Sequence, residues 1–549
     1  MTIMARTIGG PGAGKTTRAL QIIEMILDKL VSDPLRIGFV SFTRAARREA
    51  AERAAKKFDI PMAILEKEGW FRTLHSVCYR CLGIQVGELL AGSDDDNEWL
   101  RGVLGDEKAK LSGNQDDDQF AMPSDASASC RVLSLWDACR NTQTPIDKVW
   151  DKSCGNDTRM PSLSLCESII TVYEQAKREA GRFDFCDLLM RYAGKRWSGS
   201  HSAPFDDVEP EGYDPGLPVW LHDEAQDASY LTSLVFNRLI RFSTWSYLFL
   251  DEYQAIYEFA GADGRIFGRC PVAKEEILPI SYRCPSKILA TADEVMLRGG
   301  YAPRPFRSEK EGGEVIRTDL SDAIASVKAD ETTLILARTN DYAKYASQML
   351  DDLGIPWVPT KGNGGFNAPA RAAGVAALVQ LQQGKNIDAE AVFRLTQLMP
   401  ASCEGTLLFE RGTKALWKDE VHRKEHSHEL WGLSVLDMIG ATDALKEMIA
   451  TGKYLDFIER PAARMAVAAQ KHGIEAVKNP KVRVGTCHSA KGAQASHVVA
   501  VNRIPYPTQQ SIQEEEGMEA ERRVWFVTAS RASAKLTIAE GQGEVFPEL

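Results

Sequence analysis

The feature that most restricts this chain is a glycine-rich loop near its start. Residues 9–16 read GGPGAGKT, which fits G-x-x-x-x-G-K-[ST]; a short apolar run precedes them and a helical pattern follows. Such a loop folds backbone N–H groups around phosphate at a helix N-terminus. Lys15 would reach the outer phosphates and Thr16 would bind Mg²⁺; the alternative is a glycine-rich turn that occurs by chance. The nucleotide-binding candidates here are Gly9, Gly10, Pro11, Gly12, Ala13, Gly14, Lys15, Thr16 and Thr17.

A second segment supports a phosphate-binding function. Residues 219–221 form an apolar run that soon ends in the consecutive carboxylates Asp223 and Glu224. At the end of a strand, Asp223 would hold Mg²⁺, directly or through water, and Glu224 would polarise the water that attacks the γ-phosphate. Taken alone, an acidic strand end is equally well explained by a solvated loop or a helix cap. Together with residues 9–16, it predicts hydrolysis of a nucleoside triphosphate.

The order of apolar runs predicts the fold class. Strands that alternate with helices form parallel sheets covered on both faces. Two mostly helical stretches interrupt the order, at 86–180 and 385–480, and the first contains acidic, loop-like residues at 93–96 and 116–118. We therefore predict an α/β protein with two parallel-sheet domains, each with a helical insertion. The predicted strands are residues 37–42, 219–221, 247–250, 333–336, 482–486, 497–501 and 524–527.

The composition of the chain limits the cellular compartment and the kinds of partner that we expect for it. The chain has 549 residues, and 66 Lys+Arg against 76 Asp+Glu give a net charge of −10, which excludes a uniformly basic nucleic-acid coat. It has neither an apolar run of membrane-spanning length nor room for a signal peptide before residue 9, so we expect a cytoplasmic protein without a membrane partner. A polyanion would need a local basic surface. One cluster of basic residues could supply this surface; the alternative is that it forms the solvated face of an amphipathic helix. It comprises Arg36, Arg44, Arg47, Arg48, Arg53, Lys56 and Lys57.

Two groups of potential metal ligands have simpler explanations. One segment contains Cys130, Cys139, Cys154 and Cys166. These four cysteines could bind zinc or an iron–sulfur cluster, but their spacing lacks the Cys-x2-Cys pair that usually organises such a site. Buried or free thiols are therefore favoured. A histidine group comprises His422, His426 and His428. It lacks a carboxylate or thiolate set at a known spacing, which favours a solvated helix.

A series of further segments resembles, in order, the motifs of one family. Residues 223–227 (DEAQD) are similar to motif II of the UvrD/Rep/PcrA-type superfamily 1A DNA helicases. Residues 40–46 resemble motif Ia, 73–76 the motif after it, 183–189 the D-F-x-D-L-L segment, 250–262 motif III, 281–285 motif IV, 486–492 motif V and 521–532 motif VI. With the glycine-rich loop, the matches span residues 9–532. The resemblance implies two RecA-like P-loop domains that use ATP and Mg²⁺.

The same resemblance implies a division of the chain. Residues 1–85 and 181–275 would form RecA-like domain 1A, and 86–180 its helical insertion 1B. Residues 276–384 and 481–549 would form RecA-like domain 2A. Residues 385–480 would form its helical insertion 2B, which is short beside the family's usual one.

The resemblance further implies roles for residues far from the loop. Arg283 and Arg531 would cross from domain 2A to the γ-phosphate, where an arginine stabilises transition-state charge. Gln226 and Gln254 would hydrogen-bond near this phosphate, and Tyr282 would face the adenine ring. Two further nucleotide candidates are Gly492 and Gln494, although Gln494 stands where the family usually has Glu. The catalytic candidates are Lys15, Asp223, Glu224, Gln254, Arg283 and Arg531.

Candidates for nucleic-acid binding are aromatic and polar residues of these motifs. Single strands are gripped by aromatic rings that stack on bases and by a groove that neutralises the backbone. Phe259 is the strongest candidate, because the family has an aromatic residue there that stacks on a base; core packing is the alternative. The set comprises Phe42, Thr43, His75, Tyr257, Phe259, Arg338, Asn340 and His488.

The motif series predicts an ATP-dependent 3′-to-5′ DNA helicase that translocates on single-stranded DNA and unwinds duplex at single/double-strand junctions. The polarity follows from the resemblance of residues 254–262 and 488–492 to the 3′-to-5′ branch. We expect a monomer with loading or single-strand-binding proteins as partners, and its pathway stays open between DNA replication, repair, recombination and a viral replication cycle. Two alternatives stay open: a single-strand translocase that remodels protein–DNA complexes without unwinding, and a nucleotide-switched single-strand binding module.

Overall fold

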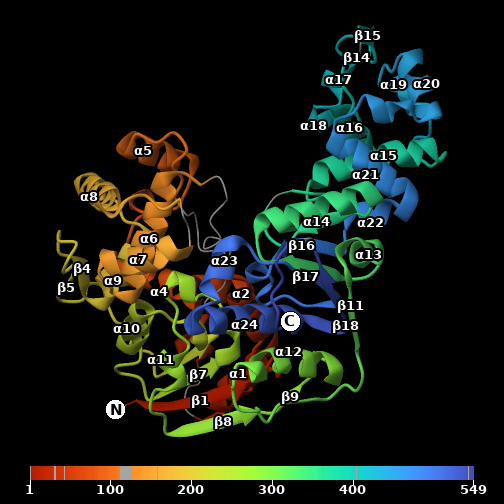
Figure 1. The fold of residues 1–549 in the computed structure, drawn as a ribbon. Coiled ribbons are helices and arrows are strands. Elements are labelled where there is room, and N and C mark those ends of the chain that lie inside the picture. The colour runs from red at the N-terminus through yellow and green to blue at the C-terminus, as the bar shows by residue number, and fades with distance from the viewer. Residues whose placement is uncertain are drawn as a thin grey trace.

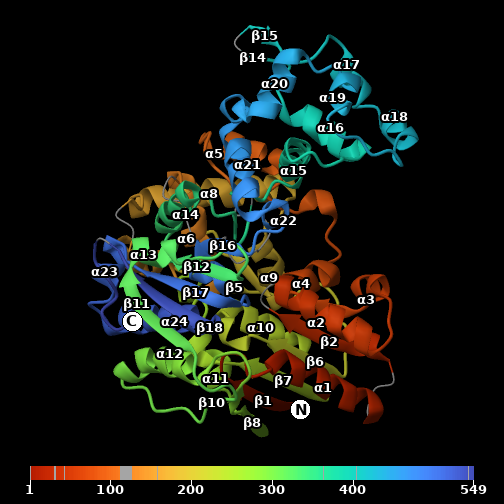
Figure 2. The same cartoon turned by 90° about the vertical axis from the view of Figure 1, so that its right-hand side faces the viewer.

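The computed structural model describes residues 2–29, 33–41, 44–111, 126–156, 159–362, 364–403, 405–541 and 543–549. Two parallel sheets lie in the lower part of Figure 1, and two mainly helical arms extend above them. The quarter-turn in Figure 2 shows the second arm, α15–α21, extending farthest from the sheets. The predicted fold class, an α/β protein with two RecA-like sheets, is confirmed.

The first sheet has the order β3-β2-β6-β7-β1-β8, and all neighbouring strands are parallel. Every residue of β2 and β6 is buried, as expected for strands covered by helices on both faces. The sheet and its helices are the first lobe. Its strands are β1 (Ile3–Gly9), β2 (Ile37–Ser41), β3 (Trp70–Arg72), β6 (Val219–Asp223), β7 (Trp245–Leu250) and β8 (Lys274–Leu278). Its helices are α1 (Lys15–Lys29), α2 (Arg44–Lys57), α3 (Met62–Glu68), α4 (Leu74–Leu82), α9 (Phe185–Ala193), α10 (Tyr230–Leu239) and α11 (Arg265–Gly268).

The second sheet has the order β11-β18-β17-β12-β16-β13 and is also parallel throughout. With its helices it forms the second lobe. Its strands are β11 (Glu314–Asp319), β12 (Thr333–Ala337), β13 (Trp357–Pro359), β16 (Val482–Thr486), β17 (Ala495–Asn502) and β18 (Ala532–Glu540). Its helices are α12 (Ser286–Arg298), α13 (Leu320–Ala325), α14 (Asn340–Leu353), α23 (Tyr506–Ser511) and α24 (Glu515–Ala529).

Short elements complete the two lobes. The two-stranded pairs are β4 (Lys195–Trp197) with β5 (Phe205–Asp207), and β9 (Ile280–Ser281) with β10 (Arg307–Ser308). The single-turn helices are η1 (Pro34–Arg36), η2 (Val86–Glu88), η3 (Ala225–Asp227), η4 (Glu252–Gln254), η5 (Glu258–Ala260), η6 (Lys453–Asp456) and η7 (His488–Ala490). Four of them, η3, η4, η5 and η7, coincide with the motif segments, which are short turns that follow sheet strands.

The first arm consists of α5 (Asp94–Leu104), α6 (Ala128–Thr142), α7 (Ile146–Asn156) and α8 (Leu163–Ala180), which share a core around Trp136 and Ile170. The loop predicted at 93–96 is wrong. Ser93 caps α5 by accepting a hydrogen bond from the Asp96 N–H, and residues 94–96 form the first helical turn, where acidic side chains favour the helix dipole. Residues 116–118 lie outside the described part of the chain.

The second arm is held by its own hydrophobic core. Its helices are α15 (Pro369–Gln382), α16 (Ala389–Leu398), α17 (Thr413–Leu416), α18 (Glu420–Glu425), α19 (Val435–Met438), α20 (Asp443–Thr451), α21 (Arg460–His472) and α22 (Ile474–Lys478), and its strand pair is β14 (Ser402–Cys403) with β15 (Thr406–Leu407). Helix α15 precedes the predicted boundary at 385, yet it packs against α16 and α21. The domain boundaries themselves stay predictions.

The predicted strands are confirmed except at 524–527, which is wrong. These residues lie in α24, where Val524, Trp525 and Phe526 are buried between α12 and the second sheet. A short apolar run cannot distinguish a strand from a buried helix, and the preceding Glu-, Met- and Ala-rich residues favour the helix. Phe42, the last residue of the run 37–42, lies outside the described residues. Among the described helices, none is long and apolar enough to cross a membrane.

Candidate nucleotide and nucleic-acid site

The glycine-rich loop connects β1 to α1 at the carboxyl edge of the first sheet. Gly12 and Gly14 have φ angles of 68° and 81°, in the left-handed region that favours glycine. The Ala13 N–H donates to the Gly10 carbonyl at 3.1 Å, which closes the turn. The buried Lys15 ammonium donates to the Gly9 carbonyl at 3.0 Å, so the positive charge of this side chain lies inside the loop. This conformation is suited to binding phosphate oxygens.

Two side chains that could hold Mg²⁺ are in contact. The Thr16 hydroxyl donates to Asp223 Oδ2 at 3.1 Å, although the two residues come from α1 and the end of β6. A hydroxyl and a carboxylate at a phosphate-binding loop are the oxygen ligands that this cation uses with nucleotides. The residues therefore fit the ion.

Glu224 follows Asp223 in an unusual backbone conformation, with φ of 55° in a residue that is not glycine. Such a conformation costs on the order of 1–3 kcal/mol and persists where the surroundings hold it in place. Here the Gln226 side-chain amide donates to Glu224 Oε2. The positive charges of Lys15, Lys491 and Arg531 stabilise the ionised Glu224 carboxylate.

Burial and charge act differently on these two carboxyl groups. Burial raises the pKa of Asp223 to about 7, and the charge of Glu224 adds to this effect. Burial also opposes ionisation of Glu224, but the positive charges of Lys15 and Lys491 outweigh it and lower its pKa to about 2. Glu224 is therefore ionised at neutral pH. A divalent cation beside Asp223 would favour the ionised form of that group as well.

The residues around β9, which precedes the second lobe's α12, lie directly against the glycine-rich loop. The Ser281 hydroxyl donates to the Pro11 carbonyl at 2.6 Å, and the Tyr282 N–H donates to the Gly12 carbonyl at 3.1 Å. A Cβ atom on Gly12 would lie 2.3 Å from Arg283 Cβ. Arg283 Nε donates to Gln494 Oε1 at 2.8 Å, which brings together two predicted nucleotide residues. Tyr282 exposes about half of its side chain beside the loop (51%).

Arg531 of the second lobe reaches a glutamine of the first. Its Nη2 donates to Gln254 Oε1 at 2.9 Å, and the arginine is almost fully buried. Burial, and then the charge of Arg283, lower the pKa of Arg531 to about 9. The two arginines, predicted from distant motifs, are therefore electrostatic neighbours. Gln226 joins the same network, because its Oε1 accepts the Asp251 N–H at 3.1 Å.

Two residues of the site were not among the predicted site residues. Lys491 Nζ donates to Asp227 Oδ1 at 2.6 Å and to the Gln254 carbonyl at 2.6 Å, which forms a buried ion pair between the lobes. Both residues belong to motif segments, which was the available signal. Their pairing could not be predicted, because they lie 264 positions apart.

The predicted nucleic-acid residues form one aromatic cluster and several separate positions. The cluster consists of Phe259, Tyr257 and His488, with the Phe259 and His488 rings 5.2 Å apart and edge-on. Tyr257 and His488 are buried, whereas Phe259 exposes about half of its side chain (49%), so simple core packing does not explain Phe259. Burial, and then the charges of Arg338 and Lys491, keep the pKa of His488 well below its ordinary value, so its ring is neutral at pH 7.

The remaining nucleic-acid candidates are more dispersed. Arg338 is bonded to Glu521 at 2.9 Å, which offsets its charge. Asn340 is exposed at the start of α14, and His75 lies on α4 with its ring edge-on to Phe185 at 6.1 Å. Phe42 and Thr43 lie outside the described residues.

The basic cluster on α2 matches the solvated-helix alternative. Arg48 pairs with Glu52 and Arg53 with Glu49, both one helical turn away, and these side chains are exposed. Arg47 and Lys57 pair with Glu66 and Glu24 of neighbouring helices. Four of the seven basic side chains in the cluster are therefore offset by carboxylates.

The predicted metal-ligand groups show no cluster in the described part of the chain. Cys139 and Cys166 are buried in the core of the first arm, and Cys130 Sγ lies near the backbone carbonyls of Lys108 and Lys110. The side chains of Cys154 and His422 lie outside the described residues, and His426 bonds to Glu429 at 2.8 Å.

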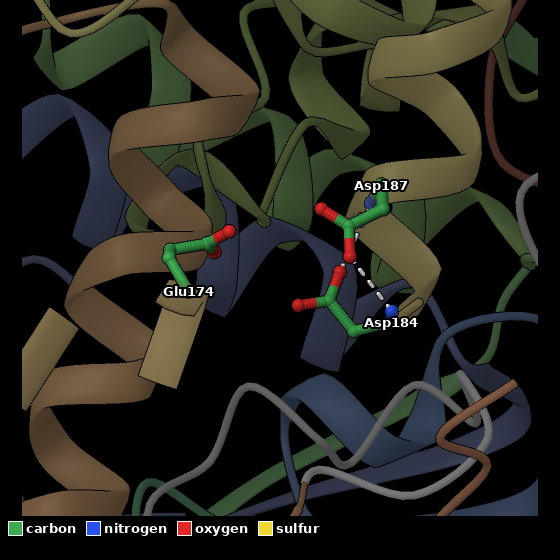
Figure 3. A group of neighbouring side chains, drawn as sticks. All are labelled: Glu174, Asp184 and Asp187. Carbon is green, nitrogen blue, oxygen red and sulfur yellow. Dashed lines mark hydrogen bonds between the residues drawn. The ribbon is translucent and has the colours of Figure 1, made fainter. Parts of the chain in front are cut away.

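Three carboxylates at the base of the first arm do lie together. Figure 3 shows Glu174 of α8 opposite Asp184 and Asp187 at the start of α9, the segment predicted as D-F-x-D-L-L. Lys177 Nζ bonds to Asp184 at 2.8 Å and to Asp187 at 2.6 Å, and Arg140 Nη1 bonds to Asp184 at 2.9 Å. The Lys177 ammonium and the Arg140 guanidinium therefore neutralise the carboxylates, as a metal ion would. The cluster fixes the arm to the first lobe.

Two RecA-like parallel sheets define a two-lobed P-loop protein. Its glycine-rich loop lies against Arg283, and Arg531 of the second lobe bonds to Gln254 of the first. Comparison with known proteins refines the class. Residues 5–271 match the family described as UvrD/REP helicase N-terminal domain. This match, which covers just under half of the chain, confirms the resemblance to this family seen in the motifs.

Curated relatives carry helicase names. The chain is 24% identical over 314 residues to a probable DNA helicase II homolog of Mycoplasma genitalium, an alignment that covers 55% of this chain and 42% of the relative. It is 23% identical over 429 residues to the putative ATP-dependent DNA helicase YjcD of Bacillus subtilis, covering 72% of this chain and 51% of the relative. The aligned part thus spans about half, or less, of the length of these relatives.

Proposed function

We propose that this protein hydrolyses ATP between its two lobes and uses the energy to move 3′-to-5′ along single-stranded DNA and to separate duplex ahead of it. The observation that carries the proposal is the meeting of both lobes at residues 9–16. Ser281 and Tyr282 bond to this loop, and Arg531 bonds to Gln254 of the first lobe. A hydrolysis site made from two lobes opens and closes with them, which is how nucleotide turnover drives movement.

Each polar group at the site has a chemical task in this proposal. Lys15 and the loop N–H groups bind the outer phosphates, and Glu224, ionised at neutral pH, orients the attacking water. Arg283 and Arg531 neutralise the charge that develops on the transferred phosphoryl group. Thr16 and Asp223 would hold Mg²⁺, which would supply positive charge beside the outer phosphates. Tyr282 and Gln494 contact the nucleoside.

The proposed track for the strand is the aromatic cluster of Phe259, Tyr257 and His488. Its exposed ring, Phe259, offers a stacking surface, and its buried members connect it to the nucleotide site. His488 precedes Lys491 in the same turn, and Lys491 bonds to the Gln254 carbonyl. A base that displaces Phe259 would therefore act on the residues that contact the γ-phosphate.

A strand-displacement assay tests the helicase activity and its polarity together. With ATP and Mg²⁺, we expect unwinding of a duplex with a 3′ single-stranded tail and none of the same duplex with a 5′ tail. Unwinding from the 5′ tail alone would overturn the polarity. Displacement of streptavidin from end-labelled single strands, without any unwinding, would replace the helicase by a translocase.

The nucleic-acid substrate is tested by the rate of ATP hydrolysis with poly-dT, duplex DNA and RNA. All three are compared at one stated salt concentration, because backbone contacts make affinity strongly salt-dependent. We expect the largest stimulation by poly-dT. Hydrolysis that no nucleic acid stimulates would favour a nucleotide-switched binding module, whose turnover only times release. The proposed loading and single-strand-binding partners, and the monomeric state, are separate predictions.

A further inference from the structure

Arg304 forms an ion pair between the lobes that no predicted role accounts for. It lies between α12 and β10, with little of its side chain exposed (14%). Its Nη1 donates to Asp251 Oδ1 of the first lobe at 2.6 Å, and its Nη2 donates to Asp293 Oδ1 of α12 at 3.2 Å. Its guanidinium also lies over the Tyr253 ring, 3.7 Å from the centroid. The two carboxylates come from different lobes, and Arg304 connects them.

Asp251 connects Arg304 to the nucleotide site through hydrogen bonds. It is fully buried, and its second oxygen, Oδ2, accepts from Gln254 Nε2 at 2.8 Å. The other end of the same amide, Gln254 Oε1, accepts from Arg531 Nη2 at 2.9 Å. An amide has one donor end and one acceptor end, so the hydrogen bond that Asp251 Oδ2 accepts determines which end faces Arg531. Turning the amide over would place its NH₂ group against the arginine and two oxygens against each other.

The segment that carries Arg304 also touches the phosphate-binding loop. Phe306 follows two residues later, and a Cβ atom on Gly10 would lie 3.0 Å from its ring. The Phe306 ring is also beneath the Arg304 guanidinium, 4.5 Å from centroid to Cζ. One stretch of chain thus contacts both first-lobe segments that bind the outer phosphates.

We propose that Arg304 is a positioning residue of the ATPase site, which holds the Asp251 side chain in place and thereby orients Gln254 toward the γ-phosphate and Arg531. The inference rests on the proposed function, and it adds a residue outside the predicted motifs. Because Asp293 anchors Arg304 on its own side, the orientation of Gln254 depends on the position of the second lobe. Hydrolysis is in this way limited to the closed arrangement.

This geometry requires the planar guanidinium group of an arginine, with its several N–H donors. Two of its nitrogens serve two carboxylates while its plane lies against aromatic rings, which a lysine ammonium cannot reproduce. We therefore expect Arg304→Lys to lower DNA-stimulated kcat on the order of 10-fold, and Arg304→Ala on the order of 100-fold, since small displacements of positioned groups have effects of this size. The KM for ATP should change by less than about threefold, as expected when a transition-state contact is lost.

The experiment measures steady-state ATP hydrolysis with poly-dT, together with the melting temperature and the Kd for a fluorescent ATP analogue. Arg298→Ala is the matched control, because Arg298 lies at the end of α12 and pairs on the surface with Glu294. It should behave as the parent. Arg304→Lys keeps a counter-charge for the buried Asp251, so it is the variant that decides the matter if Arg304→Ala does not fold.

A double variant separates positioning from general structural support. If Arg304 acts through Gln254, then Gln254→Ala combined with Arg304→Lys should be no slower than Gln254→Ala alone. Independent, multiplicative losses, or a folded Arg304→Lys protein with the parent's kcat, would overturn the inference. If Gln254→Ala itself leaves hydrolysis unchanged, the proposed function of this site fails instead, so the two failures are distinguishable.

Discussion

Phe259 is the residue whose surroundings say most about nucleic-acid binding. It is half exposed, although the rings of Tyr257 and His488 beside it are buried. We predict that Phe259→Ala lowers the stimulation of ATP hydrolysis by poly-dT while basal hydrolysis is kept, because loss of one stacking ring costs about 1–3 kcal/mol of binding. Phe242→Ala, which removes an exposed ring away from the cluster (67% exposed), is the control. An unchanged response to DNA would remove Phe259 from the track.

Lys491 illustrates the cost of leaving a buried charge without its partner. Its ion pair with Asp227 is almost completely buried, so Lys491→Met should lower the free energy of unfolding by about 3–5 kcal/mol. Lys152→Met breaks an exposed pair with Glu516, which connects the first arm to the second lobe, and should cost less than about 1 kcal/mol. Urea unfolding of both variants tests this difference. Equal losses would mean that the buried pair is not an essential contact.

His497 should make stability depend on pH. Burial, and then the charge of Lys535, lower its pKa from 6.5 to about 4, while its Nε2 bonds to Thr537 at 2.9 Å. The unfolded chain binds a proton below about pH 6.5 and the folded chain only below about 4, so the stabilisation present above pH 6.5 is lost as pH falls toward 4. The slope is at most about 1.4 kcal/mol per pH unit.

The variant His497→Gln removes this proton and keeps a polar partner for Thr537. Melting temperatures at pH 7 and pH 5 should therefore fall less for the variant than for the parent. An identical fall in both proteins would assign the acid sensitivity to other groups.

At the scale of elements, the glycine-rich loop after β1 contacts Arg283 of the second lobe. Gly12 and Gly83 have nearly equal φ angles, 68° and 67°, but a Cβ atom would meet Arg283 at Gly12 and open space at Gly83. Both alanine substitutions should cost about 1–2 kcal/mol of backbone strain. Only Gly12→Ala should also abolish ATP hydrolysis, because it displaces Arg283 from the loop. The melting temperature and the hydrolysis rate of both variants distinguish strain from displacement.

The elements also show where local sequence is sufficient. Six predicted strands are strands, because each is a short apolar or β-branched run that ends in a turn. Those at 37–42, 219–221, 247–250 and 482–486 lead into motif segments. The run at 524–527 and the acidic residues at 93–96 were misassigned for a shared reason. In both, the helix is determined by neighbours, a Glu-rich segment before Val524 and the capping serine before Asp94.

For the whole molecule, the order of motifs predicted both lobes and the resemblance to the family, since each motif is a short contiguous segment. The contacts between lobes were not predictable in the same way. Arg304 with Asp251, and Lys491 with Asp227, are single residues paired between separate segments of the chain, and the local sequence around one partner does not indicate the other. Burial gives these pairs their energetic weight, and burial follows from the packing of the complete fold.

The central claim is that the second lobe completes the hydrolysis site, and Arg531→Lys tests it most directly. The variant keeps a buried charge beside Gln254 but loses the bidentate geometry of the guanidinium. With poly-dT present, we predict a loss of turnover on the order of 10³-fold. Binding of a fluorescent ATP analogue and the melting temperature should stay close to the parent's. A folded Arg531→Lys protein that hydrolyses ATP at the parent's rate would contradict the account.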